Sequence, residues 1–156
     1  MIEAARRASS DDLPRIVELA RAAIAELRST KGGEVWARRE ARQEPIDESL
    51  VADLANADAI VLVGSIDDAV IGYAVSVIEK LFDGSEQARL TDVYVEAEAR
   101  GVGVGELLLD TVVEWATERG CTGIDSLALP GNRETKNFFE SFGLVARAIV
   151  VHRPLP

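Results

Sequence analysis

The chain has 156 residues, of which 47% are hydrophobic and 28% are charged, a composition typical of one globular domain. Its single cysteine and single histidine exclude an intrachain disulfide and a zinc site made of cysteine and histidine, so we expect no metal. Its net charge of −10, without a basic face, argues against nucleic-acid binding, and no apolar run reaches the length that spans a membrane.

The first part of the chain predicts a strand followed by helices. Residues 2–8 suit a short strand. Residues 9–27 suit a helix because their hydrophobic side chains recur every 3.6 residues. Residues 34–43 and 47–58 predict two shorter helices, with Pro45 between them.

Two strands and the turn between them are predicted next. Ala59–Val63 and Val70–Leu81 are rich in β-branched residues, and the sequence SIDD separates them. Gly72 suggests a bulge in the second strand. Residues 88–97 predict a third strand. Its alternation would place on one face Leu90, Asp92 and Tyr94, and on the other Thr91, Val93 and Val95.

Helices and strands alternate in the rest of the chain. Residues 104–121 and 132–144 predict amphipathic helices. Residues 122–130 form a nearly continuous apolar run, typical of a strand in the middle of a sheet, and residues 145–155 predict a last strand. This order predicts an α+β (mixed α/β) fold in one domain over residues 1–156. We expect a mostly antiparallel mixed sheet with helices on both faces.

Three glycines stand at alternate positions in the sequence EARGVGVGEL, where a helix should begin. Glycine costs roughly 1 kcal/mol relative to alanine inside a helix, so three of them indicate that the backbone approaches something closely. The free N–H groups of a first helical turn, together with the helix dipole, favour an anion and above all a phosphate. A turn chosen for shape alone would need one glycine, and a dinucleotide fold would need the spacing G-x-G-x-x-G, which is absent.

The sequence RGVGVG, Arg100 to Gly105, resembles the R/Q-x-x-G-x-G/A signature of the GNAT N-acetyltransferases. TDVYVEAEA before it and NRETKNFFESFGL after it resemble the flanking strand and helix of that family, and the order of elements agrees along nearly the whole chain. The resemblance implies a single GNAT-like domain whose sheet splays at a central strand and which binds acetyl-CoA as a cosubstrate. The residues that it implies for this binding are Val93, Tyr94, Val95, Arg100, Gly101, Val102, Gly103, Val104, Gly105, Asn132, Lys136 and Phe139.

The resemblance also implies where each part of acetyl-CoA binds. The diphosphate would accept hydrogen bonds from the amides between Arg100 and Gly105. The pantetheine arm would pair like an extra strand with the backbone of Val93–Val95. Asn132 and residues 136–139 would flank the thioester end and the tail of the cofactor.

Acyl transfer to an amine needs a base for the amine and an acid for the leaving thiolate. Asp92 is the preferred base because it lies beside the implied thioester site, with a structural role as the partner of an arginine or an N–H group as the open alternative. Glu79 is a second candidate base, and Tyr94 is a candidate proton donor. Phe139 stands where the family often has its tyrosine acid, which leaves the acid unassigned.

Three other conspicuous residues have plainer interpretations. His152, near the end of the sequence, is interpreted as structural or exposed rather than as a base. Cys121 has no evident partner and is not interpreted as a nucleophile. Trp36 lies in the segment that varies within the family, where it would line the acceptor pocket or cap the core.

These features predict an N-acetyltransferase that transfers an acetyl group from acetyl-CoA to a primary amine of a small molecule or protein by direct attack. The alternative is a non-catalytic acyl-CoA-binding module. The expected partners are acetyl-CoA and an amine-bearing acceptor, without nucleic acid or membrane, and the sequence does not decide between a monomer and the homodimer common in the family. A lone cysteine and a start without a secretory signal lead us to expect a cytoplasmic location.

Overall fold

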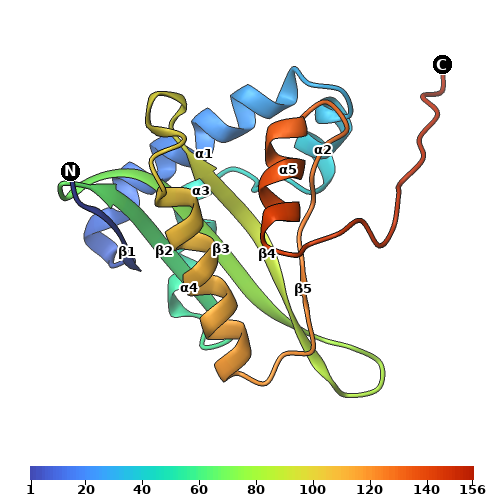
Figure 1. The fold of residues 1–156 in the computed structure, drawn as a ribbon. Helices are drawn as coiled ribbons and strands as arrows, with labels where there is room; N and C mark the ends of the chain where they lie inside the picture. Colours follow the sequence, from blue (N-terminus) through green and yellow to red (C-terminus); the bar gives the residue numbers. More distant parts are fainter.

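A five-stranded sheet forms the centre of the computed structural model, which describes residues 1–156 (Figure 1). The strands are β1 (Glu3–Arg7), β2 (Ala59–Ile66), β3 (Ala69–Lys80), β4 (Glu86–Val95) and β5 (Ile124–Asp125). They lie in the order of the chain, and each pairs antiparallel with its neighbour except β4 and β5, which are parallel.

Helices cover both faces of this sheet (Figure 1). They are α1 (Leu13–Arg28), α2 (Gly33–Arg39), α3 (Ile46–Ala55), α4 (Val104–Glu118) and α5 (Arg133–Ser141), with short 3-10 turns at η1 (Ser10–Asp12) and η2 (Ala97–Ala99). One buried cluster joins α1 and α3 to the sheet, and a second joins α4 to its other face. None of the helices combines the length and the apolar character that crossing a membrane requires. The predicted α+β fold is confirmed.

The predicted hairpin is formed by β2 and β3. Two aspartates in its turn, Asp67 and Asp68, have φ of 47° and 68°, a left-handed conformation that matches the twist of the two strands. The register shifts between Gly64 and Ser65, beside the position of Gly72 at which the sequence predicts a bulge.

A second bulge changes the faces of β4. Leu90 and Asp92 lie opposite consecutive residues of β3, so Thr91 between them has no partner. Leu90 therefore packs with Val93 in the cluster under α4, whereas Tyr94 packs in the cluster under α1. The predicted face that grouped Leu90 with Asp92 and Tyr94 is wrong, because strict alternation takes no account of an extra residue.

β4 and β5 pair only briefly before they separate. Backbone pairing joins residues 88–89 to residues 124–125, and just beyond it Ser126 Oγ donates a hydrogen bond to the carbonyl of Leu90 at 3.0 Å. The sheet therefore splays here, as the resemblance implies. The strand predicted at residues 122–130 is shorter than expected and lies at the edge of the sheet, because no further strand pairs with its outer side.

Residues 144–156 contain no helix or strand, so the strand predicted at residues 145–155 is not formed within this chain. The segment runs away from the rest of the domain (Figure 1). β-Branched residues favour a strand only where a neighbouring strand exchanges hydrogen bonds with them. Residues 145–156 make no backbone–backbone hydrogen bond.

Candidate functional site

The glycine-rich turn between β4 and α4 needs its glycines for two different reasons. Gly101 and Gly103 have φ of 85° and 91°, in the left-handed region that side chains with a Cβ disfavour. Gly105 lies inside the first turn of α4, where an added Cβ would stand 3.4 Å from the ring of Phe138 on α5. The first two glycines shape the turn, and the third lets α5 pack close to the start of α4.

The backbone amides of this turn have no acceptor in the protein. None of the N–H groups of residues 101–106 donates a hydrogen bond, and Gly103, at the N-cap of α4, provides no side-chain cap. A Cβ built on Gly101 or Gly103 would meet no atom within 4 Å, so the turn is open to solvent on the side where a side chain would stand. Together with the positive end of the helix dipole, these donors form a site suited to an anion.

Arg100 lies beside this turn but is already partly paired. Its Nε donates to the carbonyl of Val95 at 2.9 Å, and its Nη2 donates to Glu26 of α1 at 2.7 Å. The hydrogen bond to Glu26 raises the pKa of the Arg100 guanidinium above its usual value. Its guanidinium also lies over the ring of Tyr94, 5.4 Å from the ring centre. Arg100 thus links β4 and α1 at the rim of the site.

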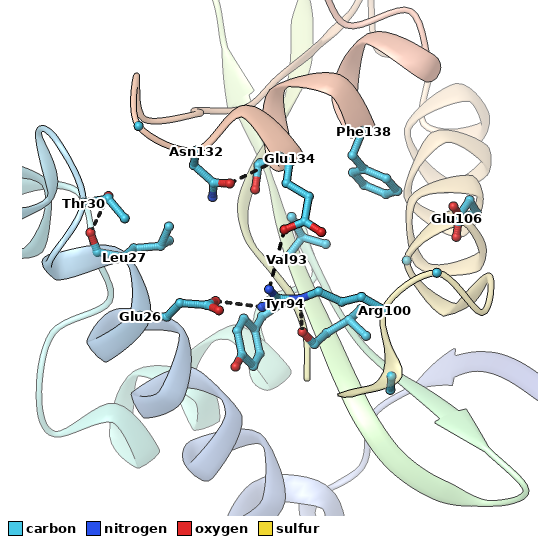
Figure 2. A pocket seen from close by; sticks show the side chains of 16 residues that line it. Glu26, Leu27, Thr30, Val93, Tyr94, Arg100, Glu106, Asn132, Glu134 and Phe138 are labelled. Carbon is cyan, nitrogen blue, oxygen red and sulfur yellow. Dashed lines mark hydrogen bonds and ion pairs between the residues drawn. The ribbon is translucent and has the colours of Figure 1, made fainter. Parts of the chain in front are cut away.

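A cavity of about 360 Å³ opens between α1, the end of β4, the glycine turn and α5 (Figure 2). It is lined by Glu26, Leu27, Thr30, Val93, Tyr94, Val95, Ala99, Arg100, Gly101, Gly105, Glu106, Gly131, Asn132, Glu134, Thr135 and Phe138. Seven of the cofactor-binding residues expected from the sequence are thus brought together around one cavity. We call it the first cavity.

The other expected cofactor residues lie around the first cavity without lining it. Val102 and Gly103 are in the turn itself, where their amides are among the free donors. Val104 is buried in the core, and Lys136 pairs with Glu140 on its own helix. Phe139 lines a second cavity instead.

The second cavity, of about 290 Å³, adjoins the first. Both cavities are lined by Leu27, Val93, Asn132 and Thr135, so they meet where β4 and β5 separate. The side chains in the second cavity that bear on its chemistry are Trp36, Arg42, Tyr73, Asp92, Asp125, Phe139 and Arg147. The two cavities are therefore neighbours that share part of their lining.

Comparison with known proteins identifies this arrangement. Residues 18–144 match the model of the Acetyltransferase (GNAT) family. The chain belongs to this family. A thialysine N-epsilon-acetyltransferase from Bos taurus is 27% identical over 74 residues, 47% of this chain and 44% of that protein, so the chain matches less than half of the relative's length.

Solved structures agree with the GNAT fold over the whole chain. A mutant protein from Bacillus halodurans superposes with a TM-score of 0.82 and 17% identity, covering 100% of both chains. AAC(6')-Iy in complex with the bisubstrate analogue CoA-S-monomethyl-acetylneamine superposes with a TM-score of 0.76 and 17% identity, covering 100% of this chain and 99% of that one. At such low identity these structures establish the fold.

In this GNAT protein, the carboxylate of Asp92 is held from several sides. Arg42 of the segment after α2 donates from Nε to Oδ2 at 3.0 Å and from Nη2 to Oδ1 at 2.8 Å. The hydroxyls of Tyr73 and Thr91 each donate to it at 2.7 Å. Four donors occupy the carboxylate, and its side chain is only 9% exposed. The arginine partner that the sequence analysis left open is therefore present.

The contacts with Asp92 raise the pKa of both Arg42 and Tyr73. Burial opposes the charge of Arg42, but hydrogen bonds and charges from Asp92 and Asp53 more than offset it, so the pKa of Arg42 is raised above its usual value. Burial, followed by the charge of Asp92, holds the pKa of Tyr73 well above its usual value. Arg42 therefore stays charged, and the Tyr73 hydroxyl stays protonated.

The other two candidate catalytic residues lie in different places. Tyr94 lines the first cavity, and its hydroxyl makes no hydrogen bond to the protein. Burial and the charge of Glu26 raise the pKa of Tyr94 above its usual value. Glu79 lies opposite Gln87 at the far end of the β3–β4 pair, lines neither cavity, and accepts a hydrogen bond from Gln87.

The remaining conspicuous residues also differ in whether they line a cavity. Trp36 lines the second cavity. Cys121 lines neither cavity, and burial raises the pKa of its thiol. His152 is exposed in residues 144–156. The sequence analysis missed Arg42, because its contact with Asp92 spans 50 residues and no local pattern indicates it.

Proposed function

We propose that this GNAT protein is an acetyl-CoA-dependent N-acetyltransferase that acts on a primary amine. The observation that supports this most is the row of amides in residues 101–106, which have no acceptor in the protein and lie beside the first cavity. A diphosphate is the ligand that suits several converging N–H groups at a helix N-terminus. The coenzyme A analogue bound to AAC(6')-Iy supports the same proposal.

The chain provides a path for the rest of the cofactor. Beyond residues 88–89, β4 has no strand on the side of β5, so this edge is open beside the first cavity at Val93–Val95. An extended amide-containing arm can add to such an edge as a strand does. Acetyl-CoA would supply an acetyl group activated as a thioester, and Asn132, shared by both cavities, would flank that end.

We assign the second cavity to the amine acceptor. It meets the first cavity at Val93, so an amine in it would lie close to the acetyl group. Trp36 and Phe139 provide apolar walls, and the Asp125 carboxylate in the same cavity is paired with Arg147. The net charge of −10 would favour the approach of a cationic amine.

The geometry suggests roles for the two polar side chains of β4. Tyr94 is the proposed proton donor to the leaving thiolate, because its hydroxyl is protonated and has no partner in the protein. Asp92 is proposed to position Arg42 and Tyr73, since its carboxylate already accepts four hydrogen bonds from the protein. Water would then remove the proton from the amine.

A second candidate function is a non-catalytic acyl-CoA-binding module. The observation that favours it is Phe139, which stands where the resembling family often has a tyrosine and is only 6% exposed. Such a protein would bind the cofactor through the same amides without transferring the acetyl group.

Incubation of the protein with acetyl-CoA, a panel of primary amines and a reagent for free thiols distinguishes these functions. Release of coenzyme A that depends on an amine, with the acetylated amine seen by mass spectrometry, supports the enzyme. Binding of acetyl-CoA by calorimetry without release for any amine supports the second candidate. Failure to bind acetyl-CoA contradicts both.

A further inference from the structure

The second cavity is lined by six charged side chains, and all but one of them form a hydrogen-bonded pair with a side chain of opposite charge. The pairs are Arg42 with Asp92, Arg147 with Asp125, and Glu40 with Arg39, which lies outside the cavity. Every carboxylate in the lining is therefore already engaged by an arginine, and none is left to attract the charge of a bound molecule.

Arg89 of β4 is the remaining charged side chain. It makes no hydrogen bond, and the Oε2 of Glu79 on β3 lies 3.9 Å from its Nε, too far for one. Glu79 accepts a hydrogen bond from Gln87 instead and lines neither cavity. The Arg89 side chain is 56% exposed, so both of its Nη groups are available to a molecule in the second cavity.

We propose that Arg89 binds a carboxylate of the amine acceptor, so that the preferred acceptor is an amino acid whose amine and carboxylate are far apart. Arg89 has this role only if the second cavity holds the acceptor, as the proposed function assigns. A guanidinium suits a carboxylate because two of its N–H groups donate in parallel to the two oxygens.

The surroundings of Arg89 favour a carboxylate over a phosphate. Asp125 lies opposite Arg89 in the register of β4 with β5, and Glu79 lies on its other side, on β3. These two carboxylates would repel a phosphate with its two negative charges more strongly than a carboxylate with one. A single arginine between them therefore suits an anion of one charge.

The place of Arg89 on β4 sets how far apart the two groups of the acceptor must be. The two cavities meet at Val93, four residues further along the same strand. Four residues of strand span roughly 13 Å, of which the long Arg89 side chain can cover a part. An α-amino acid carries its amine and carboxylate on one carbon, so it is too short to reach both points. The same cavity has apolar lining for an alkyl chain between the two groups, from Ile24, Leu27 and Leu129.

Acetylation of two matched acceptors tests this role. The acid ε-aminocaproate has a terminal amine and a distant carboxylate, and its amide has the same length without the charge. We expect kcat/KM to be about tenfold higher for the acid, as one charge-assisted pair would give, and this preference should disappear in Arg89→Met. Arg89→Lys should keep part of it, because the charge remains without the two parallel donors.

Arg7→Met is the matched control, because Arg7 is also an exposed arginine on a strand but lines neither cavity. It should keep the native preference for the acid. Equal kcat/KM for the acid and the amide in the native protein, or a preference that survives in Arg89→Met, overturns the role of Arg89.

Calorimetry separates failure of this role from failure of the proposed function. The acid and the amide are titrated, with coenzyme A present, into the native protein and into Arg89→Met, which requires no acetyl transfer. If no amine is acetylated but the native protein alone binds the acid about tenfold more tightly than the amide, the proposed function fails and the role of Arg89 stands. Equal binding of the two compounds by the native protein, or binding of neither, overturns the role of Arg89 even if other amines are acetylated.

Discussion

Arg42 donates hydrogen bonds to both carboxylate oxygens of Asp92, from Nε at 3.0 Å and from Nη2 at 2.8 Å, although 50 residues separate the two in the sequence. Both side chains are 9% exposed. Nη1 of the same guanidinium donates to Asp53 of α3 at 2.8 Å, so one arginine ties α3 to β4. The wall of the second cavity is fixed by this contact.

Replacing Arg42 should destabilise the protein strongly. Arg42→Met removes the partner of a buried carboxylate, and leaving such a charge unpaired costs about 3 kcal/mol or more. Urea unfolding followed by circular dichroism measures the loss. Arg21→Met is the control, since its pair with Glu44 is exposed on both sides and should contribute little. Equal losses for both variants would contradict the role given to Arg42.

The variant Asp92→Asn tests which of two roles Asp92 has, that of the base or that of a residue that positions Arg42. If Asp92 positions Arg42, the melting temperature should fall, while the residual activity keeps the shape of the native pH–rate profile. If Asp92 is the base, the acidic limb of that profile should disappear, and the melting temperature should fall as well because the same hydrogen bonds are weakened. The shape of the pH–rate profile, measured on the purified variant, therefore distinguishes the two roles.

Gly103→Glu should abolish the anion site. The new carboxylate would stand in front of the free amides of residues 101–106, and we expect acetyl-CoA affinity to fall at least about tenfold, or ~1.4 kcal/mol, by calorimetry. Gly120→Glu is the matched control, because Gly120 also has a positive φ and open space but follows the opposite end of α4. Equal affinity in the two variants would show that the amides do not bind the cofactor.

Much of this site could be predicted from the sequence because its signals are local. The spacing of Gly101, Gly103 and Gly105 before a helical pattern indicates exposed amides, and the structure shows those amides without acceptors. The hairpin and the long helices follow from periodicity and turn residues in the same way. Each depends on neighbours within a few residues. The splay of the sheet is expected only from the resemblance to the family.

The parts that could not be predicted depend on distant partners. The bulge at Thr91 is set by the pairing of β4 with β3, and it moved Leu90 to the other face of the sheet. The contact between Arg42 and Asp92 leaves no trace in either local sequence. Residues 145–155 have the composition of a strand, but within this chain no neighbour pairs with them.

Tyr94→Phe tests the proposed proton donor. The variant should bind acetyl-CoA as the native protein does, and kcat should fall about 100-fold if the hydroxyl protonates the thiolate. Since the pKa of Tyr94 is raised above its usual 10.0, native activity should show no alkaline loss from this group until the pH exceeds about 10. An unchanged kcat would remove Tyr94 from the reaction.

The pH dependence of stability should depend on Asp12, which joins β1 to the start of α1. Its carboxylate accepts from Arg6 at 2.8 and 3.0 Å and from the amide of Ser9 at 2.8 Å, and the bond to Arg6 chiefly lowers its pKa below the usual 3.8. A lowered pKa means that this stability is present above about pH 4 and is lost as the pH falls through the lowered value.

Asp12→Asn should therefore lower the free energy of unfolding at neutral pH by about 1.5 kcal/mol, the contribution of charge-assisted hydrogen bonds, and flatten its fall below pH 4. Urea unfolding at a series of pH values measures both effects. Asp11→Asn is the control, because the neighbouring side chain is exposed and makes no hydrogen bond, and its curve should follow that of the native protein. If the Asp12 variant keeps the native slope below pH 4, the stability lost in acid comes from other carboxylates.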